Sequence, residues 1–522
     1  MPNSETPEKI IPTKEVDDTA VSLALPENYI AEWQERGLEK QAETYEAVTR
    51  ICRAVQEAGG RALLVGGSVR DILLDVESKD FDIEVYGLEA DKLEGLLRPF
   101  GRLGEVGKAF SVLKLSIKDG FEIDVSLPRR DSKTESKRGR GISAQSDPYM
   151  SISEATRRRD FTINAILADP LTGQVFDPYH GIDDLKNKTL RIVDEKTFSE
   201  DPVRVLRAMQ MIGRFDLTMD EDSRRVMSSM ADSLKHLSEE RIYEEWRKLL
   251  LKSDKPSRGL QAGVELGVFK ELHPEFLALQ ETPQDPKIHP EGNVWEHTLL
   301  AVDEMMDIAR REKLTDQEIW PLMLATLCHD LGKAKTTEEK DGKIIAHGHD
   351  LASVGLTKVF LDSIRVDGAT EARVLPLVRH HMRPMYLYND MLQNREIKDG
   401  VFRRLARDLA PSSIRESAFL SEADYRATRR EDKEKIKELV EWLIAKAESI
   451  GVDRQVAPEI MWGRDFLQMG FAPGPEIGRL IYLSRELRDN RGFSQEDIIQ
   501  VLSGIKDVTE AMGKLEKLLL TD

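Results

Sequence analysis

Cysteine and long apolar runs are nearly missing from this chain. Only two of its 522 residues are cysteine, which excludes a disulfide framework and makes a cytoplasmic setting the default expectation. No apolar run approaches the roughly 20 residues that a membrane-spanning helix requires, and the polar N-terminus lacks the apolar segment of a signal peptide. The sequence therefore predicts a cytoplasmic protein that does not span a membrane.

Aromatic residues and net positive charge are also scarce. Aromatics make up 6% of the chain and charged residues 33%, which is typical of a soluble, helix-rich protein and disfavours a β-sandwich. The formal charge of −18 disfavours indiscriminate binding of polyanions. One local exception is Arg129–Arg140, which holds six basic and two acidic residues. This segment is interpreted either as a solvated, mobile loop or as a flexible loop that contacts phosphate.

Hydrophobic periodicity divides the chain into an α/β head and a long helical body. A helical pattern covers Glu27–Gly59, and strand patterns follow at about 61–66, 80–86, 111–117 and 121–127. From Pro202 onward apolar residues recur almost only at helical spacing, so the predicted fold class is α+β. The predicted domains are a disordered tail at 1–25, a head at 26–190, a helical neck at 191–280, a second functional unit at 281–430 and a helical C-terminal region at 431–522.

The stretch Leu64–Glu84 has the features of a phosphate site. Gly66 and Gly67 allow the backbone to approach a ligand closely, and the amides of the helix that follows can bind phosphate oxygens. Ser68 and Arg70 can add a hydroxyl and a guanidinium to the same anion. The pattern predicts an anion site at this turn.

Two aspartates follow the turn on a predicted strand. Asp80 and Asp82 are two residues apart, so their carboxylates point to one face and suit a hard cation such as Mg²⁺. Asp124 is expected to add a third carboxylate from a neighbouring strand. Two Mg²⁺ ions held in this way would activate a 3′-hydroxyl and stabilise a departing pyrophosphate. The alternative is a solvated strand face.

Three motifs resemble those of a known family. GGSVRD at 66–71, KDFDIE at 79–84 and RRRDFTINAI at 157–166 resemble the class II tRNA nucleotidyltransferases (CCA-adding enzymes) and bacterial poly(A) polymerases, over about residues 50–280. The resemblance implies a nucleotidyltransferase head in which the paired aspartates hold the metals. It also implies that four residues contact the ribose and triphosphate: Arg158, Arg159, Asp160 and Asn164.

Asp201 and Arg204 lie three residues apart at the start of a predicted helix. A carboxylate that accepts beside a guanidinium that donates complements the base edge of cytosine or adenine, whereas uracil and guanine present the reverse pattern. Spacing alone favours an ordinary surface ion pair. The resemblance to the family's EDxxR motif instead implies that this pair selects CTP and ATP without a nucleic-acid template, and Arg207, one turn further on, is assigned to the same site.

Seven of the ten histidines fall between residues 289 and 381. Four residues resemble the metal ligands of the HD-domain superfamily: His297, His329, Asp330 and Asp424. His349 and His380 stand where relatives with a two-metal centre have further histidines, with His347 and His381 as alternatives. The resemblance implies a centre for Mn²⁺, Ni²⁺, Co²⁺ or Fe that hydrolyses phosphoesters.

An HD domain after the neck favours tRNA maturation over poly(A) synthesis within this family. The expected function is template-independent addition of C, A or both to the tRNA 3′ end from CTP and ATP, with an additional phosphohydrolase activity. Two alternatives are a poly(A) polymerase and an HD phosphohydrolase whose head only binds nucleotide. The amphipathic helices of 431–522 are interpreted by default as structural packing, and the resemblance implies that they also help to hold the tRNA.

Overall fold

The computed structural model describes residues 20–25, 33–35, 38–77, 81–106, 112–117, 121–136, 139–430 and 433–520. The chain forms two compact units, Met1–Leu234 and Lys235–Asp522. The boundary between them falls inside the predicted neck. Asp80 lies outside the described residues, as do residues 1–19 of the predicted tail.

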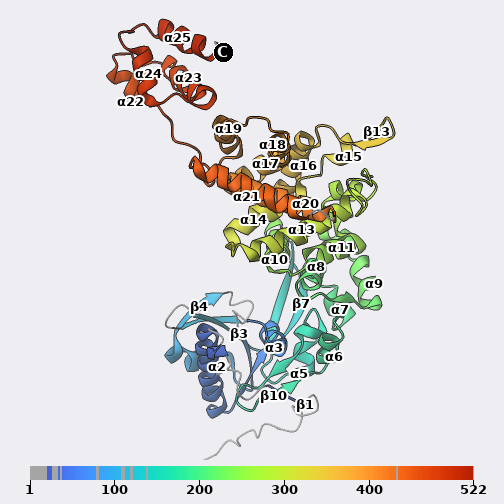
Figure 1. The fold of residues 1–522 in the computed structure, drawn as a ribbon. Coiled ribbons are helices and arrows are strands. Elements are labelled where there is room, and N and C mark those ends of the chain that lie inside the picture. Colours follow the sequence, from blue (N-terminus) through green and yellow to red (C-terminus); the bar gives the residue numbers. More distant parts are fainter. Residues whose placement is uncertain are drawn as a thin grey trace, which may run out of the picture. The chain divides into compact units, whose positions relative to one another are not determined.

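The first unit is built on an eight-stranded mixed sheet (Figure 1). Its strands are β1 Ala20–Ala24, β2 Arg61–Val65, β3 Phe81–Tyr86, β4 Arg102–Val106, β5 Val112–Ile117, β6 Phe121–Ser126, β9 Leu167–Ala168 and β10 Gln174–Phe176. Their order in the sheet is β1-β10-β9-β2-β3-β6-β5-β4. Only β3 and β6 run parallel, and the other neighbouring pairs are antiparallel.

Helices and short elements complete the first unit. They are α2 Glu39–Glu57, α3 Gly67–Leu73, α4 Ala90–Leu97, α5 Ile152–Thr156, α6 Gly181–Lys186, α7 Glu195–Phe198, α8 Val203–Phe215 and α9 Glu221–Ser229, with a small parallel pair of β11 Thr189–Leu190 and β12 Thr218–Met219. In α2, Tyr45, Val48, Ile51 and Val55 recur at helical spacing and are buried. This buried stripe packs the helix on β2 and β3.

Two predictions about the first unit need correction. Ala20–Ala24, at the end of the predicted disordered tail, forms edge strand β1 and pairs with β10. The basic segment predicted to be a loop forms β7 Arg129–Ser136, which pairs with β8 Gly139–Ser146 from Arg129↔Ser146 to Ser136↔Gly139. The hydrogen bonds of a β-ladder join backbone groups, so this pair forms without an apolar pattern in the sequence.

The second unit is helical apart from a small antiparallel pair, β13 Glu338–Lys340 and β14 Lys343–Ile345. Its α-helices are α10 Glu239–Lys252, α11 Pro256–Glu265, α12 Val268–Leu272, α13 Val294–Arg311, α14 Asp316–Cys328, α15 Lys333–Thr336, α16 His349–Ser363, α17 Gly368–His380, α18 Arg383–Leu392, α19 Asp399–Leu409, α20 Ile414–Ala427, α21 Lys433–Ser449, α22 Gly463–Gln468, α23 Glu476–Arg491, α24 Gln495–Leu502 and α25 Val508–Leu520. None of the helices in the described part of the chain is both long and apolar enough to span a membrane.

Two helices of the second unit, α13 and α20, are held together by an ion pair between the exposed Arg311 and the buried Glu422. The guanidinium of Arg311 donates to both carboxylate oxygens of Glu422, at 2.6 and 2.7 Å. Glu422 is almost fully buried, so both of its oxygens require partners. The pair brings together the helix that carries His297 and the helix that carries Asp424.

Candidate functional site

In the head, Asp82 and Asp124 lie directly beside each other on neighbouring strands. They are register partners in the parallel pair of β3 and β6, and both side chains are partly buried. Partners in adjacent strands point to the same face of a sheet. Two carboxylates on one face are a donor set that suits a hard divalent cation, so these residues fit the predicted Mg²⁺.

The glycine turn lies against an arginine of the second motif. Gly66 has a φ of +72°, which favours glycine, and a Cβ atom there would lie 2.8 Å from Nη1 of Arg159. Nε of Arg159 is buried and makes no hydrogen bond within the described part of the chain. An unpartnered buried guanidinium nitrogen beside a glycine turn suits an anionic ligand. Gly67 begins α3 next to it.

Ser68 and Arg70, predicted to bind the anion, make hydrogen bonds within the protein. The hydroxyl of Ser68 donates to the carbonyl oxygen of Val65 at 3.1 Å. The guanidinium of Arg70 is buried and donates to Asp71 at 2.6 and 2.9 Å and to the side-chain oxygen of Asn164 at 2.5 Å. These hydrogen bonds hold the turn and the start of α3 in place.

Asp160 connects the second motif to α8. Its carboxylate accepts from the side-chain amide of Asn164 at 3.0 Å and lies 3.0 Å from Nη2 of Arg207. Burial alone would raise the pKa of Asp160, but the charge of Arg207 and the hydrogen bonds from Asn164 and Phe161 hold the pKa below its ordinary value. Asp160, Asn164 and Arg207 therefore form one buried polar network.

The predicted base-selecting pair lies where the sequence places it, at the start of α8. Nη1 of Arg204 donates to the carbonyl oxygen of Thr197 at 3.1 Å, and Nη2 donates to that of Arg158 at 2.7 Å. Asp201 accepts from the backbone N–H of Val203 at 3.3 Å. Both side chains are partly buried. The two backbone oxygens fix the orientation of the Arg204 guanidinium.

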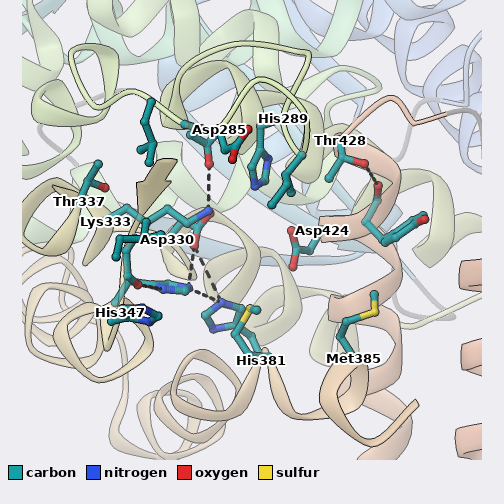
Figure 2. Close-up of a pocket in the computed structure, with 18 of the residues that line it drawn as sticks. Asp285, His289, Asp330, Lys333, Thr337, His347, His381, Met385, Asp424 and Thr428 are labelled. Atoms are coloured by element: carbon teal, nitrogen blue, oxygen red, sulfur yellow. Dashed lines mark hydrogen bonds and ion pairs between the residues drawn. The ribbon is translucent and has the colours of Figure 1, made fainter. Parts of the chain in front are cut away.

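Four side chains that line one cavity of the helical body, among them Asp330, His381 and Asp424 (Figure 2), belong to a set of six that converge from five segments. The six are His297 of α13, His329 and Asp330 after α14, His349 at the start of α16, His381 after α17 and Asp424 of α20. They form two groups of possible metal ligands, His297–His329–Asp424 and Asp330–His349–His381, and within the described residues His297 also belongs to a third group with His289 and Glu291.

The ligand atoms of these groups lie close together. Nε2 of His297 is 3.1 Å from Asp424 Oδ1, and Nε2 of His329 is 3.3 Å from Asp330 Oδ2. Nε2 of His349 is 3.4 Å from the other oxygen of Asp330. Asp330 thus faces both groups, one with each carboxylate oxygen.

The second ring nitrogens show which tautomer each histidine adopts. Nδ1 of His329, His349 and His381 lies 2.7, 2.7 and 2.8 Å from a backbone carbonyl oxygen, so each Nδ1 carries the proton. The Nε2 atoms then present lone pairs to one another, and those of His349 and His381 are only 3.1 Å apart. Two facing lone pairs repel each other, and a cation bound by both nitrogens removes this repulsion. The residues therefore fit a divalent metal centre.

His381 takes the position that the sequence analysis gave to His380. The two residues are consecutive at the end of α17, where neighbouring side chains point in different directions around the helix, and only His381 faces Asp330. Burial lowers the pKa of His380, which has Asp408 and Arg383 near it. His347, the other alternative, is exposed and lines the cavity without joining either ligand group of the described residues.

Glu291, whose carboxylate contacts two histidines, was not predicted from the sequence. Oε1 of this buried carboxylate lies 2.8 Å from Nδ1 of His297 and 2.8 Å from Nδ1 of His289. Burial opposes the charge of Glu291, but these two hydrogen bonds lower its pKa to about 2. Burial likewise opposes the charge of His297, and Asp424 with Glu291 raises its pKa to about 9. Glu291 lies in the irregular segment before α13, where no periodic pattern marks it.

The cavity beside the histidines has a volume of about 450 Å³. Its wall includes Lys333, whose Nζ lies 2.6 Å from Asp330 and donates to Gln284 at 2.9 Å. Arg430 and Lys435 add positive charge, and Ile344 and Met385 add apolar surface. Such a wall suits a phosphorylated ligand with an apolar part.

Three family descriptions match consecutive parts of the chain. They are the Poly A polymerase head domain at residues 62–191, the probable RNA and SrmB-binding site of polymerase A at 216–279, and the HD domain at 294–429. The first contains the aspartate, glycine and arginine motifs, and the third contains His297, the His329–Asp330 pair and Asp424. These matches confirm the resemblance that the motifs indicate.

Solved structures with a similar fold include a CCA-adding enzyme from Bacillus stearothermophilus in complex with CTP, which is 18% identical, covers 85% of this chain and 93% of that chain, and has a TM-score of 0.56. A CCA-adding enzyme from Thermotoga maritima in complex with tRNA is also 18% identical, covers 92% of this chain and 95% of that chain, and has a TM-score of 0.54. At this identity the similarity shows the fold, and it confirms an α/β head with a helical body.

The multifunctional CCA proteins have a higher sequence identity to this chain than these solved structures have. A multifunctional CCA protein from Pasteurella multocida is 36% identical over 306 residues, which are 56% of this chain and 67% of the relative. One from Xanthomonas campestris is 32% identical over 375 residues, which are 70% of this chain and 84% of the relative. The chain therefore belongs to the family of the multifunctional CCA proteins, and it is an enzyme of the nucleotidyltransferase class.

Proposed function

We propose that this enzyme adds C, A or both to the 3′ end of tRNA, using CTP and ATP without a nucleic-acid template and releasing pyrophosphate. The observation that carries the proposal is the pairing of Asp82 with Asp124 on neighbouring parallel strands. The same unit contains the Gly66–Arg159 anion site and the Asp201–Arg204 pair. The names of the relatives, and the CTP and tRNA bound in similar structures, support this substrate choice.

In this proposal different residues of the head have different roles in nucleotide transfer. Asp82 and Asp124, together with Asp80, hold two Mg²⁺ ions. Bound there, the ions supply the charge that favours an ionised 3′-hydroxyl and an in-line departure of pyrophosphate. Arg159 binds the triphosphate beside the glycine turn, and Arg158 contacts the ribose or triphosphate from the same motif. Asp160 and Asn164 hold this motif against α8, where Arg207 joins them.

Asp201 and Arg204 select the base in this proposal. The two backbone oxygens that hold Arg204 leave its guanidinium in one orientation. A fixed donor beside the carboxylate of Asp201 accepts the edge of cytosine or adenine and leaves uracil or guanine with unmatched polar groups.

We also propose that the histidine centre is a phosphohydrolase. His297, His329, Asp330 and Asp424 would hold one divalent ion, and Asp330, His349 and His381 a second, with Mn²⁺, Ni²⁺, Co²⁺ or Fe as the expected metals. A centre of this kind activates bound water. Lys333 is then placed to bind a phosphoryl oxygen, because its ammonium lies 2.6 Å from Asp330 and faces the cavity. The fixed imidazole tautomers support this second activity.

The domain assignment stays a proposal as well. We infer a head at 26–190, a neck at 191–280, an HD-type domain at 281–430 and a C-terminal region at 431–522 that contacts tRNA. The buried core that α22 to α25 share supports a separate role for the last region. A cytoplasmic location is proposed from the low cysteine content.

Incubation of the pure protein with tRNA that lacks its 3′ terminus tests the transfer function. Each of the four nucleoside triphosphates is labelled in turn, and label from CTP, ATP or both is expected in the tRNA, with little from UTP or GTP. An unrelated RNA serves as the control. Long A tracts on that RNA would support the poly(A) polymerase alternative, and no incorporation of C or A into tRNA would contradict the proposal.

A further inference from the structure

Glu84 is a fully buried carboxylate on the strand that carries Asp82. Strand alternation places Asp82, Glu84 and Tyr86 on one face of β3, and the side chain of Glu84 has no exposed surface. On the β2 side of this face the neighbouring residues are apolar, since Leu63 is the register partner of Glu84. Leu63, Val65, Ile152, Ala155 and Leu167 form a buried cluster with Tyr86. An acid is therefore present where the surroundings favour a hydrocarbon.

Both oxygens of Glu84 have a partner. Nη2 of Arg158 donates to Oε1 at 2.8 Å, and the hydroxyl of Tyr86 donates to Oε2 at 2.7 Å. Arg158 follows α5 in the chain and is 74 residues away from Glu84 in the sequence. The carboxylate thus fixes the side chain of an arginine in the nucleotide-contact motif.

The same arginine holds the predicted base-selecting residue through its backbone. The carbonyl oxygen of Arg158 accepts from Nη2 of Arg204 at 2.7 Å, which is shorter than the 3.1 Å contact of Arg204 with Thr197. A continuous set of contacts therefore runs from β3 through Glu84 and Arg158 to Arg204. Every member belongs to the first compact unit.

Stability does not explain why a carboxylate occupies this position. A buried ion pair loses the hydration of both charges, and an apolar side chain of similar volume often serves the fold equally well. The carboxylate instead fixes the orientation of the Arg158 side chain, because a charge-assisted hydrogen bond is short and has a narrow range of angles. A fixed side chain also restricts the peptide of Arg158, whose carbonyl oxygen orients the guanidinium of Arg204.

We propose that Glu84 is a positioning residue for base selection, acting through Arg158 on Arg204. The inference rests on the proposed role of Arg204 and extends it to a residue that does not contact nucleotide. With Glu84 in place, the guanidinium of Arg204 presents a fixed donor to the base. Without the carboxylate, the side chain of Arg158 loses this anchor, and its peptide keeps the 2.9 Å hydrogen bond from the N–H of Arg159 to the carbonyl oxygen of Thr156. Arg204 is then held less tightly and accommodates uracil or guanine more readily.

The test compares Glu84→Gln and Tyr86→Phe with the wild-type chain. Equilibrium binding of CTP and UTP is measured by competition without tRNA, and kcat/KM for each nucleotide is measured with tRNA. Glu84→Gln should lower the preference for CTP over UTP about tenfold, which corresponds to one weakened charge-assisted hydrogen bond. Tyr86→Phe, which removes one hydrogen bond and keeps the ring, should lower it about threefold.

Asp169→Asn is the matched control. This carboxylate is also buried in the first unit and pairs with an arginine, Arg61, at 3.1 Å, but neither residue contacts the nucleotide-contact motif in the bonds that the structure records. The control should leave the preference for CTP unchanged, even if it lowers stability. An equal loss of kcat/KM for all nucleotides in Glu84→Gln, with the preference unchanged, would overturn the inference.

Arg204→Ala separates this inference from the proposed function. If Arg204→Ala lowers the preference for CTP and Glu84→Gln does not, the inference fails and the base-selecting role of Arg204 stands. If neither variant changes the preference, the base-selecting role itself fails. Should Glu84→Gln not fold, Tyr86→Phe decides the question, and an unchanged preference in that variant overturns the inference.

Discussion

At the scale of single residues, the proposed nucleotide site depends on a glycine that no other residue can replace without strain. Gly66 combines a positive φ with close approach to Arg159. The sequence identified this glycine, because a Gly-Gly-Ser turn before a helical pattern is a local signal. It assigned Ser68 and Arg70 to the ligand as well, whereas the structure uses both for internal hydrogen bonds.

Gly66→Ala should therefore lower both stability and nucleotide binding. A left-handed conformation costs a non-glycine residue about 1–2 kcal/mol in free energy of unfolding, and the new methyl group displaces Arg159. We expect a loss of that size in urea denaturation and a rise of about tenfold in the KM for CTP and ATP. Gly95→Ala is the control, since Gly95 is exposed in α4 with open space around it. Equal KM values for the two variants would contradict this role of Gly66.

Glu291 shows what sequence reasoning overlooks at this scale. Its contact with His297 crosses from an irregular segment to a helix, and no spacing rule links an acid to a histidine six residues later. The histidines themselves were predicted, because metal-ligand residue types were concentrated in one part of the chain.

Glu291→Gln should weaken metal binding without unfolding the protein. Carboxylates that orient a metal-bound imidazole typically contribute 10- to 100-fold in affinity, and a loss of about that size is expected in a calorimetric Mn²⁺ titration. Glu296→Gln is the matched control. Glu296 caps α13 with its carboxylate, and glutamine performs the same capping role. The same affinity in both variants would show that Glu291 does not orient His297.

At the scale of elements, the strict alternation of apolar and polar residues correctly predicted the positions of the central strands. Phe81, Ile83 and Val85 are buried on β3, and this pattern is visible in the sequence. The pair of β7 and β8 was missed because its polar residues carry no such alternation. In α19, Phe402, Leu405, Ala406 and Leu409 follow helical spacing and are buried. The apolar spacing that predicts this helix is therefore present in the sequence.

The end of α17 provides a prediction about metal stoichiometry. His381 faces Asp330 and His349, whereas the adjacent His380 lies outside both groups of ligand residues that the structure describes. His381→Ala should reduce the bound Mn²⁺ from two ions to one per chain, measured by elemental analysis after dialysis. His380→Ala should keep both ions. Equal stoichiometry in the two variants would contradict the proposed second metal site.

At the scale of the whole molecule, the chain has two chemical centres in two compact units. Asp82 and Asp124 belong to the first unit, and the histidine centre belongs to the second. Motifs in the sequence predicted both candidate centres, since each contains a short motif, the paired aspartates in the head and His329–Asp330 in the body. The contacts that orient them were not predictable, because Glu84 and Arg158 are brought together only by the fold.

The central claim is that each centre carries its own activity, with nucleotide transfer in the head. The most direct test measures nucleotide incorporation into tRNA and metal-dependent phosphoester hydrolysis in three preparations: the wild type, Asp82→Asn and His329→Ala. Asp82→Asn should lower incorporation at least about a hundredfold and keep hydrolysis, because one metal-binding carboxylate is lost from the head. His329→Ala should do the reverse. Full incorporation by Asp82→Asn, or its loss in a folded His329→Ala, would contradict the account.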